Sequence, residues 1–391
     1  MTTYKEIFGK QIKQVSSDPT DAGAEGQIWF NTTLGSFRTV VSVGAWSSSG
    51  NLGTARAQGG SSGSTQNNAL FAGGYTTAQV ANTEEYDGSS WTAGGNLTTG
   101  RYRLAGANFA PQTAGLVFGG RAPSPPGGSD RNETEEYNGS SWSEQNNLST
   151  ARRAIAGAGI QTSAIAIGGE GPGLLASTEE YDGSSWTGGG NYPTATIGLG
   201  SFGATGTSAI AVGGADAVAG GQTRGAIYDG SSWTSIAAIP VGRTYMAGFG
   251  TTASGMIAGG QSAPGAAISN ATSYDGTNWT VENSLATARY YNGGGGSSGT
   301  SGVVFAGNTP PVTNATEEFN FTIFSPIAAT WASGGNLGTA RRLIGAAGTT
   351  AAGLGFGGRL GPNATTDVTE EYNGTSWSEQ NNLTTARFGP G

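Results

Sequence analysis

The stretch Thr83–Trp91, TEEYDGSSW, decides the fold of this chain. Near-identical copies recur at Thr134–Trp142, Thr178–Trp186 and Thr369–Trp377, looser copies end at Trp233 and Trp279, and an interrupted copy runs from Thr316 to Trp331. Glu-Glu-Tyr alternates polar and aromatic residues, as an extended strand does. The Asp-Gly or Asn-Gly pair that follows favours a two-residue hairpin turn with positive φ at both central positions. Each copy therefore predicts a β-hairpin, and seven hairpins predict a fold built from repeats.

Two further markers recur with the same period. One is an apolar run ending in Gly-Gly, such as Leu70–Gly74 or Leu116–Gly120; in the sixth copy, Val303–Asn308, Asn308 stands in the place of the second Gly. The other is an Arg that follows a turn: Arg56, Arg101, Arg152, Arg243, Arg289 and Arg341, with Thr196 in the fourth unit. Each unit then holds four short strands, and such a sheet buries both faces only when units stack radially. The sequence predicts an all-β propeller, and counting the Gly-Gly sites gives seven four-stranded blades.

The order of these markers resembles the Kelch repeat family over residues 51–391. That resemblance implies a seven-bladed β-propeller around a central channel, and it implies no particular function. The N-terminal segment SSDPTDAGAEGQIWFNTTLGSFRT, followed by NGSSW and NLTTAR repeats, resembles virion proteins of marine tailed bacteriophages. There, such modules precede the repeat domains of fibre-like proteins, which implies a tail-fibre or other virion role.

Composition excludes several classes of function. The chain has no Cys and no His, so disulfides, thiolate chemistry, a Ser-His-Asp triad and His or Cys zinc sites are excluded. A net charge of −8, with only 11% charged residues, argues against nucleic-acid binding. No apolar stretch is long enough for a transmembrane helix, and the start lacks a signal-peptide core. We expect no cofactor, no metal site and no membrane insertion, and synthesis in the host cytoplasm before incorporation into a virion.

The first 50 residues differ from the repeats. Met1–Gln14 predicts a short helix or arm, and residues 27–46 predict a hairpin of two strands. We interpret residues 1–50 as an N-terminal attachment module and residues 51–391 as the propeller. An eighth blade, built from Arg387–Gly391 with the 27–46 hairpin, is the alternative to seven.

The Glu pairs suggest paired carboxylates, as in glycoside hydrolysis. Adjacent strand residues point to opposite faces, however, and five equivalent copies favour a structural role. Units with Glu-Glu also have the repeated Arg, whereas unit 4 has neither and unit 5 has only Arg243. We therefore predict an Arg–Glu bridge within each blade, between its first and third strands, and no catalytic residue.

The repeated aromatic residues predict packing between blades, with a sugar-stacking ladder as the alternative reading. They are Trp91, Trp142, Trp186, Trp233, Trp279, Trp331 and Trp377, with Tyr86, Tyr137 and Tyr181.

Recognition is expected where the repeat is not obeyed. The loops between strands 2 and 3 share a face and vary in length, which is typical of binding loops on a rigid scaffold. The candidate contacts there are Tyr75, Arg121, Asp130 and Arg131, with neutral drift as the alternative. The apolar insert Asn320–Ala329 adds Phe321 and Phe324 as a partner patch; the alternatives are that it folds over the channel mouth or packs on the N-terminal hairpin.

These features predict a non-enzymatic virion structural or adhesion protein of a tailed phage, associated with the tail or fibre. Residues 1–50 would bind other virion proteins, and the propeller would bind a host-surface glycan or protein, in many copies. The alternatives are a capsid decoration or head-fibre protein, a carboxylate-dependent glycan-cleaving propeller and an intracellular Kelch scaffold.

Overall fold

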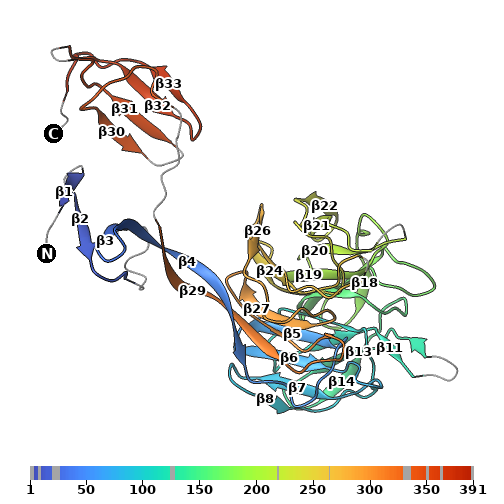
Figure 1. Ribbon diagram of the computed structural model, residues 1–391. Helices are drawn as coiled ribbons and strands as arrows, with labels where there is room; N and C mark the ends of the chain where they lie inside the picture. Colours follow the sequence, from blue (N-terminus) through green and yellow to red (C-terminus); the bar gives the residue numbers. More distant parts are fainter. Residues whose placement is uncertain are drawn as a thin grey trace. The chain divides into compact units, whose positions relative to one another are not determined.

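The structure is a computed structural model that describes residues 4–7, 10–19, 27–123, 128–217, 220–263, 265–328, 336–348, 352–361 and 364–388. These residues form strands and no helix, and most strands belong to four-stranded antiparallel sheets (Figure 1). The chain divides into two compact units. We call Val40–Ser325 the ring unit; the terminal unit contains Met1–Pro19, Gly26–Thr39 and Pro326–Gly391.

Five sheets of the ring unit are continuous in sequence. Blade 1 is β5 (Gly60–Thr65), β6 (Asn68–Ala72), β7 (Thr83–Tyr86) and β8 (Trp91–Ala93). Blade 2 is β9 (Ala105–Gly106), β10 (Leu116–Phe118), β13 (Thr134–Tyr137) and β14 (Trp142–Gln145), with the small hairpin β11 (Arg121–Ala122) and β12 (Ser129–Asp130) in its 2–3 loop. Blade 3 is β15 (Ala156–Ile160), β16 (Ser163–Ile167), β17 (Thr178–Tyr181) and β18 (Trp186–Gly188). Blade 4 is β19 (Ile197–Thr205), β20 (Ser208–Ala215), β21 (Gly225–Tyr228) and β22 (Trp233–Ile236). Blade 5 is β23 (Ala247–Thr251), β24 (Ser254–Ala258), β25 (Ala271–Tyr274) and β26 (Trp279–Glu282).

The sixth blade is assembled from both ends of the sequence. It contains β27 (Gly293–Ser298), β28 (Ser301–Phe305) and β29 (Thr316–Ala328), and its outer strand is β4 (Ser36–Ser49). Trp46 of β4 stacks on Phe319 of β29 with ring centroids 5.0 Å apart, as Trp91 stacks on Tyr86 at 5.1 Å in blade 1. The link continues the match, because the Leu52 amide donates to the Asn314 carbonyl as the Leu97 amide does to Ala81. Trp46 therefore fills the position that the repeat pattern assigns to Trp331, which lies outside the described residues.

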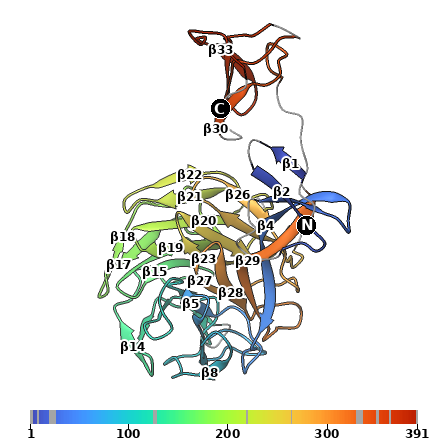
Figure 2. The ribbon, with the colours of Figure 1, turned by 90° about the vertical axis from the view of Figure 1, so that its left-hand side faces the viewer.

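The six blades surround a common axis, and the first meets the sixth (Figure 2). At the seam, the phenol of Tyr86 donates to Glu318, and the Trp91 indole donates to Thr316 Oγ1 at 2.9 Å. The backbone amide of Gly307 also donates to the Arg56 carbonyl, as Gly74 donates to Arg101 between blades 1 and 2. The seam repeats the hydrogen bonds that join neighbouring blades elsewhere, so the propeller-like ring has six blades.

The expectation of seven blades is not confirmed. The seventh repeat does form a four-stranded sheet, of β30 (Gly345–Gly348), β31 (Gly353–Phe356), β32 (Thr369–Tyr372) and β33 (Trp377–Gln380), but it belongs to the terminal unit. The physical reason is that β4 already supplies the outer strand of the sixth blade and lets it meet the first. For the same reason the expected boundary at residue 50 does not coincide with the division of the structure, since β4 extends into the ring unit. The hairpin predicted for residues 27–46 serves the sixth blade instead of an eighth.

The N-terminal segment is extended rather than helical. β1 (Tyr4–Ile7) pairs with β2 (Lys10–Val15), β2 runs parallel to β3 (Ile28–Asn31), and β3 forms the predicted hairpin with β4. Asp18 organises this part, because its carboxylate accepts hydrogen bonds from Trp29 Nε1 at 2.8 Å, Asn31 Nδ2 at 2.7 Å and Arg38 Nε at 3.0 Å. The helical alternative for Met1–Gln14 is thus wrong for the described residues 4–7 and 10–14.

Two local predictions need correction. Tyr86 pairs with Trp91, so the Asp-Gly turn contains four residues, and only Gly88 has positive φ, at 95°. The Asp87 carboxylate satisfies the turn by accepting the amides of Ser89 and Ser90, both at 2.8 Å, and these bonds lower the pKa of Asp87 to about 2. In the sixth repeat, the register of β28 places Ala306 and Gly307, with φ of 58° and 111°, at the Gly-Gly positions, and Asn308 follows them.

The predicted Arg–Glu bridge is confirmed. The first Glu of each pair binds the Arg of its own blade: Arg56–Glu84, Arg101–Glu135, Arg152–Glu179, Arg289–Glu317 and, in the seventh repeat, Arg341–Glu370 at 3.6 Å. In blade 5, which lacks the Glu pair, Arg243 donates to Thr272 Oγ1 at 2.6 Å. The same carboxylates accept backbone amides of the preceding link, as Glu135 does from Thr98 at 2.9 Å. The pair therefore fixes the link and the third strand in one register.

The remaining residues of the motif join neighbouring blades. The second Glu accepts a hydrogen bond from the Tyr of the next blade: Tyr137 to Glu85 at 2.5 Å, Tyr181 to Glu136 at 3.0 Å, and Tyr228 to Glu180. The Thr accepts from the Trp of the next blade: Trp142 to Thr83 and Trp186 to Thr134, both at 2.9 Å, and Trp233 to Thr178 at 3.2 Å. We call these two contacts the Tyr latch and the Trp latch. TEEY thus has a structural role at every position.

We expect the Tyr latch to make stability depend on alkaline pH. Burial, followed by the hydrogen bond to Glu85 or Glu180, raises the pKa of Tyr137 and of Tyr228 to about 12, from an ordinary value of 10. The unfolded chain then loses these phenolic protons at lower pH than the folded chain does. The stabilisation is complete below pH 10 and is lost as the pH rises from about 10 to about 12.

The measurement is the urea midpoint across this range of pH. Tyr137→Phe removes one titrating latch, so we expect a lower midpoint at neutral pH and a shallower fall above pH 10. A wild-type midpoint that stays constant through the window would show that the phenols do not bridge the blades.

Candidate functional site

Six residues form a ring at the start of the innermost strands, on the face of the 2–3 loops. They are Gln58, Arg103, Ala154, Gly198, Tyr245 and Tyr291, all with φ between 52° and 66°. Each backbone amide donates to the carbonyl of the ring residue in the preceding blade, at 2.7 to 3.1 Å, and Gln58 closes the cycle by donating to Tyr291. The cycle presents six side-chain positions on one rigid collar. We call it the channel collar.

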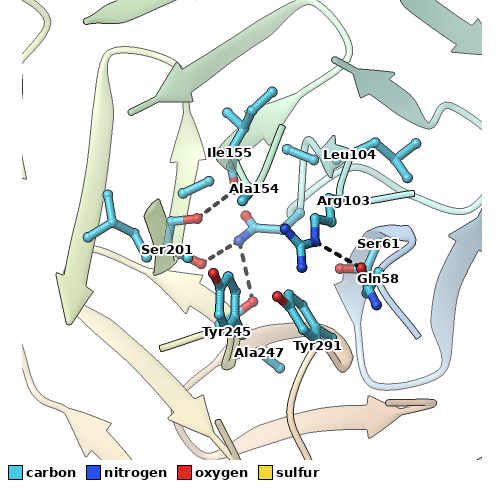
Figure 3. Close-up of a pocket in the computed structure, with 18 of the residues that line it drawn as sticks. Gln58, Ser61, Arg103, Leu104, Ala154, Ile155, Ser201, Tyr245, Ala247 and Tyr291 are labelled. Atoms are coloured by element: carbon cyan, nitrogen blue, oxygen red, sulfur yellow. Dashed lines mark hydrogen bonds between the residues drawn. The ribbon is translucent and has the colours of Figure 1, made fainter. Parts of the chain in front are cut away.

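A cavity of about 110 Å³ lies inside the collar, as Figure 3 shows. Besides the collar, its lining includes Ser201, Asn108, Asn292 and small residues of the innermost strands. Asn108 crosses the channel from blade 2, and its Nδ2 donates to the Ser201 carbonyl at 2.5 Å and to the Gly248 carbonyl at 3.3 Å. The Oδ1 atoms of Asn108 and Asn292 are buried without a hydrogen-bond partner in the described part of the chain. The cavity is therefore a polar pocket that the Asn108 side chain spans.

Arg103 provides the positive charge of this pocket. Its Nε donates to Gln58 Oε1 at 3.1 Å, and its guanidinium carbon lies 5.5 Å from the centre of the Tyr291 ring (Figure 3). Tyr291 stacks on Tyr245 at 4.1 Å, and burial raises the pKa of Tyr291, so this phenol stays neutral. No Asp or Glu lines the cavity, and no described residue accepts a hydrogen bond from the Nη atoms of Arg103. The arrangement holds the guanidinium in place and leaves its terminal donors for an anionic or carbonyl acceptor.

The candidate loop residues lie on the same face as the collar. Tyr75 and Arg121 pair through their backbones with Ala57 and Tyr102, the residues that precede Gln58 and Arg103. The Tyr75 ring also packs on Tyr102, with centroids 5.3 Å apart. The loops and the channel thus form one surface.

Two of the predicted contacts are engaged within the loops. Asp130 accepts hydrogen bonds from Arg153 at 2.8 Å, and Arg131 bridges Glu133 at 3.2 Å. Arg153 also bridges Glu170 at 2.8 Å, which joins the 2–3 loops of blades 2 and 3. Asp130 and Arg131 therefore stiffen the loop, and their role as contacts stays a prediction.

The apolar insert is partly described. Phe321 is half-buried and packs near Phe319, with ring centroids 6.2 Å apart, so it extends the core of blade 6. The side chain of Phe324 lies outside the described residues, as does Trp331. The insert itself is the outer part of β29, which pairs with β4.

The four Glu pairs of the ring unit do not line the pocket. In the ring unit, the first Glu binds the blade's Arg, and four second Glu residues hold the Tyr of the next blade. The repeated Trp residues stack on the Tyr of their own blade at 4.8 to 5.1 Å. These residues hold blades together.

Sequence reasoning missed the collar, although a signal exists. Each collar residue stands two positions after the repeated Arg or Thr196, and this position changes from Gln to Arg, Ala, Gly, Tyr and Tyr within an otherwise regular repeat. Variation at a fixed repeat position marks residues that packing does not determine. Among the described residues, no group of three or more Asp or Glu side chains suits a metal ion.

No family model matches this chain, and no curated protein matches it. A solved structure titled "Structure of YjhT" is similar, with a TM-score of 0.55 and 15% sequence identity, over 68% of this chain and 95% of that chain. At this identity the likeness shows the fold alone. The chain has an all-β, propeller-like fold. The described residues contain no helix long and apolar enough to span a membrane.

Proposed function

We propose that this chain is a non-enzymatic virion structural and adhesion protein of a tailed phage, with a Kelch-type propeller, associated with the tail or fibre. Its propeller binds an acidic group on the host surface at the channel collar, and residues 1–50 bind other virion proteins. The observation that carries the binding role is Arg103, whose Nη donors face a pocket without carboxylates.

The pocket's size supports adhesion over catalysis. Small-molecule sites usually have volumes of about 300–1,000 Å³, whereas this cavity has about 110 Å³. Only the end of a ligand, such as a carboxylate or sulfate, fits beside Arg103. The rest of the ligand would lie on the surrounding 2–3 loops, as in a surface contact. The Glu pairs that suggested glycan cleavage are engaged in bridges between strands and blades, which weighs against that alternative.

The neutral variant Arg103→Gln tests the binding role. We expect it to weaken binding to immobilised acidic glycans by about tenfold to a hundredfold, since a hydrogen bond to a charged group contributes about 1.5–3 kcal/mol. Binding should also weaken with added salt. The measurement is surface plasmon resonance with acidic and matched neutral glycans.

Arg387→Gln is the matched control, because it removes the same charge from an exposed side chain that belongs neither to the collar nor to the 2–3 loops of the ring unit. Equal binding of acidic glycans by wild type and Arg103→Gln would contradict the role of the collar. The virion role has a separate test, quantitative mass spectrometry of purified particles. The proposal requires a fixed number of chains per particle, and absence of the chain from them would refute it.

A further inference from the structure

The seventh repeat exposes an apolar side chain that the six blades of the ring bury. Leu354 of β31 is 37% exposed, whereas its six counterparts in the ring are completely buried. Those counterparts are Leu70, Leu116, Ile165, Ile210, Met256 and Val303. In blade 1, the corresponding Leu70 packs against Tyr137 and Trp142 of blade 2. The exposed Leu354 therefore marks the face that receives the next blade.

The polar latch residues of this repeat are also unused. Thr369 Oγ1 is buried and has no hydrogen-bond partner, although its counterparts Thr83 and Thr134 each accept from a Trp of the next blade. Glu371, Tyr372 and Trp377 form no side-chain hydrogen bond within the described ranges 336–348, 352–361 and 364–388. Each of these groups bonds across a blade interface in blades 1 to 3. The sheet thus carries both halves of an interface, one on each face.

We propose that the β30–β33 sheet packs head to tail against the same sheet of a second copy of this chain. The face with Leu354, Thr369 and Glu371 of one copy receives Tyr372 and Trp377 of the next copy. The residues of the receiving face indicate which partner fits it. By analogy with the ring, Glu371 would accept a hydrogen bond from a Tyr phenol and Thr369 would accept one from a Trp indole. In the ring unit, the corresponding residues of the seam between blades 6 and 1, Tyr86 and Trp91, are already engaged with Glu318 and Thr316.

The expected number of copies follows from the geometry of the ring. A row of copies joined head to tail has an open face at each end, unless the rotation between neighbours closes the row into a ring. The same contact closes after six blades within the ring unit. Six copies would therefore close a second ring from their seventh repeats.

Native mass spectrometry of the full chain at micromolar concentration tests this interface. We expect the wild type to form a closed hexamer. Leu354→Asp places a charge on the receiving face and should raise the dissociation constant by about tenfold to a hundredfold. Tyr372→Phe, which removes only the phenolic hydroxyl, should raise it by about tenfold.

Leu34→Asp is the matched control, because Leu34 is an exposed Leu in the turn between β3 and β4 and is 59% exposed. This variant should associate as the wild type does. Since Leu354 is exposed in the single chain, Leu354→Asp should fold, and circular dichroism checks that it does. A monomeric wild type, or an oligomer that folded Leu354→Asp leaves unchanged, overturns the proposal.

Discussion

Glu135→Ala should lower the free energy of unfolding by about 3–5 kcal/mol, the range found when one partner of a buried ion pair is removed. Arg101 and Glu135 are each only 1% exposed in their side chains, and their N–O distance is 2.6 Å. The truncation leaves the guanidinium buried without its counter-charge. It also removes the acceptor of the Thr98 amide, 2.9 Å away. Urea denaturation measures the change.

The control lies on the neighbouring strand. Glu144 pairs with Glu135 across β13 and β14 and is exposed, so Glu144→Ala should change the free energy of unfolding by less than about 0.5 kcal/mol. Replacing both partners, Arg101→Met with Glu135→Leu, should cost less than Glu135→Ala alone, because no buried charge is left uncompensated. Equal losses for Glu135→Ala and Glu144→Ala would show that the bridge does not hold the blade.

The sequence predicted the Arg–Glu bridge because the repeats are an internal comparison. Unit 4 lacks both groups, with Thr196 and Ala226 in their places, and this joint absence indicated a contact within the blade. The fold class followed in the same way from the period of Trp and Gly-Gly. The sequence did not predict that Tyr and Trp bind the preceding blade. The alternation of residues along a strand shows which side chains share a face, but it does not show which neighbouring blade that face contacts.

The number of blades was not predictable from the repeat count. Seven repeats are compatible with a seven-bladed ring. The ring has six blades because the N-terminal strand β4 supplies the outer strand of the sixth blade. The stretch from Val40 to Trp46 has no TEEY marker and gave no signal for that role except the Trp itself. Closure is a long-range contact between segments that are distant in the chain, such as Leu52 and Asn314, which are 262 residues apart, and local patterns do not encode it.

The sequence predicted loop contacts, among them Tyr75 and Arg121, but it did not predict the collar. The 2–3 loops lie on the same face as the collar, since Tyr75 and Arg121 pair with the residues that precede Gln58 and Arg103. Whether this face binds a ligand stays a prediction. The sequence did not single out Arg103, because it stands close to Arg101, one of the Arg residues that recur in the repeats with a structural role. Its distinction is positional, two residues after Arg101, where packing leaves the side chain free to point into the channel.

Trp46→Ala should cost about 3–5 kcal/mol of the ring's stability, the usual loss for a large aromatic residue in a packed site. Trp46 packs on Phe319 and donates through Nε1 to the Asn283 carbonyl at 2.8 Å. β4 also approaches closely, because a Cβ on Gly44 would lie 2.0 Å from the Phe319 ring. Among the described blades of the ring unit, blade 6 is the one that combines strands distant in the sequence. Loss of β4 would therefore open the ring at this blade.

The most direct test of the six-bladed account compares Trp46→Ala with Trp331→Ala in chemical denaturation of the full chain. The account predicts a loss of about 3–5 kcal/mol for the ring transition with Trp46→Ala, and a change below about 1 kcal/mol with Trp331→Ala. A seven-bladed ring, in which Trp331 completes the sixth blade, predicts the reverse order. A larger loss for Trp331→Ala than for Trp46→Ala would contradict closure by the N-terminal strand.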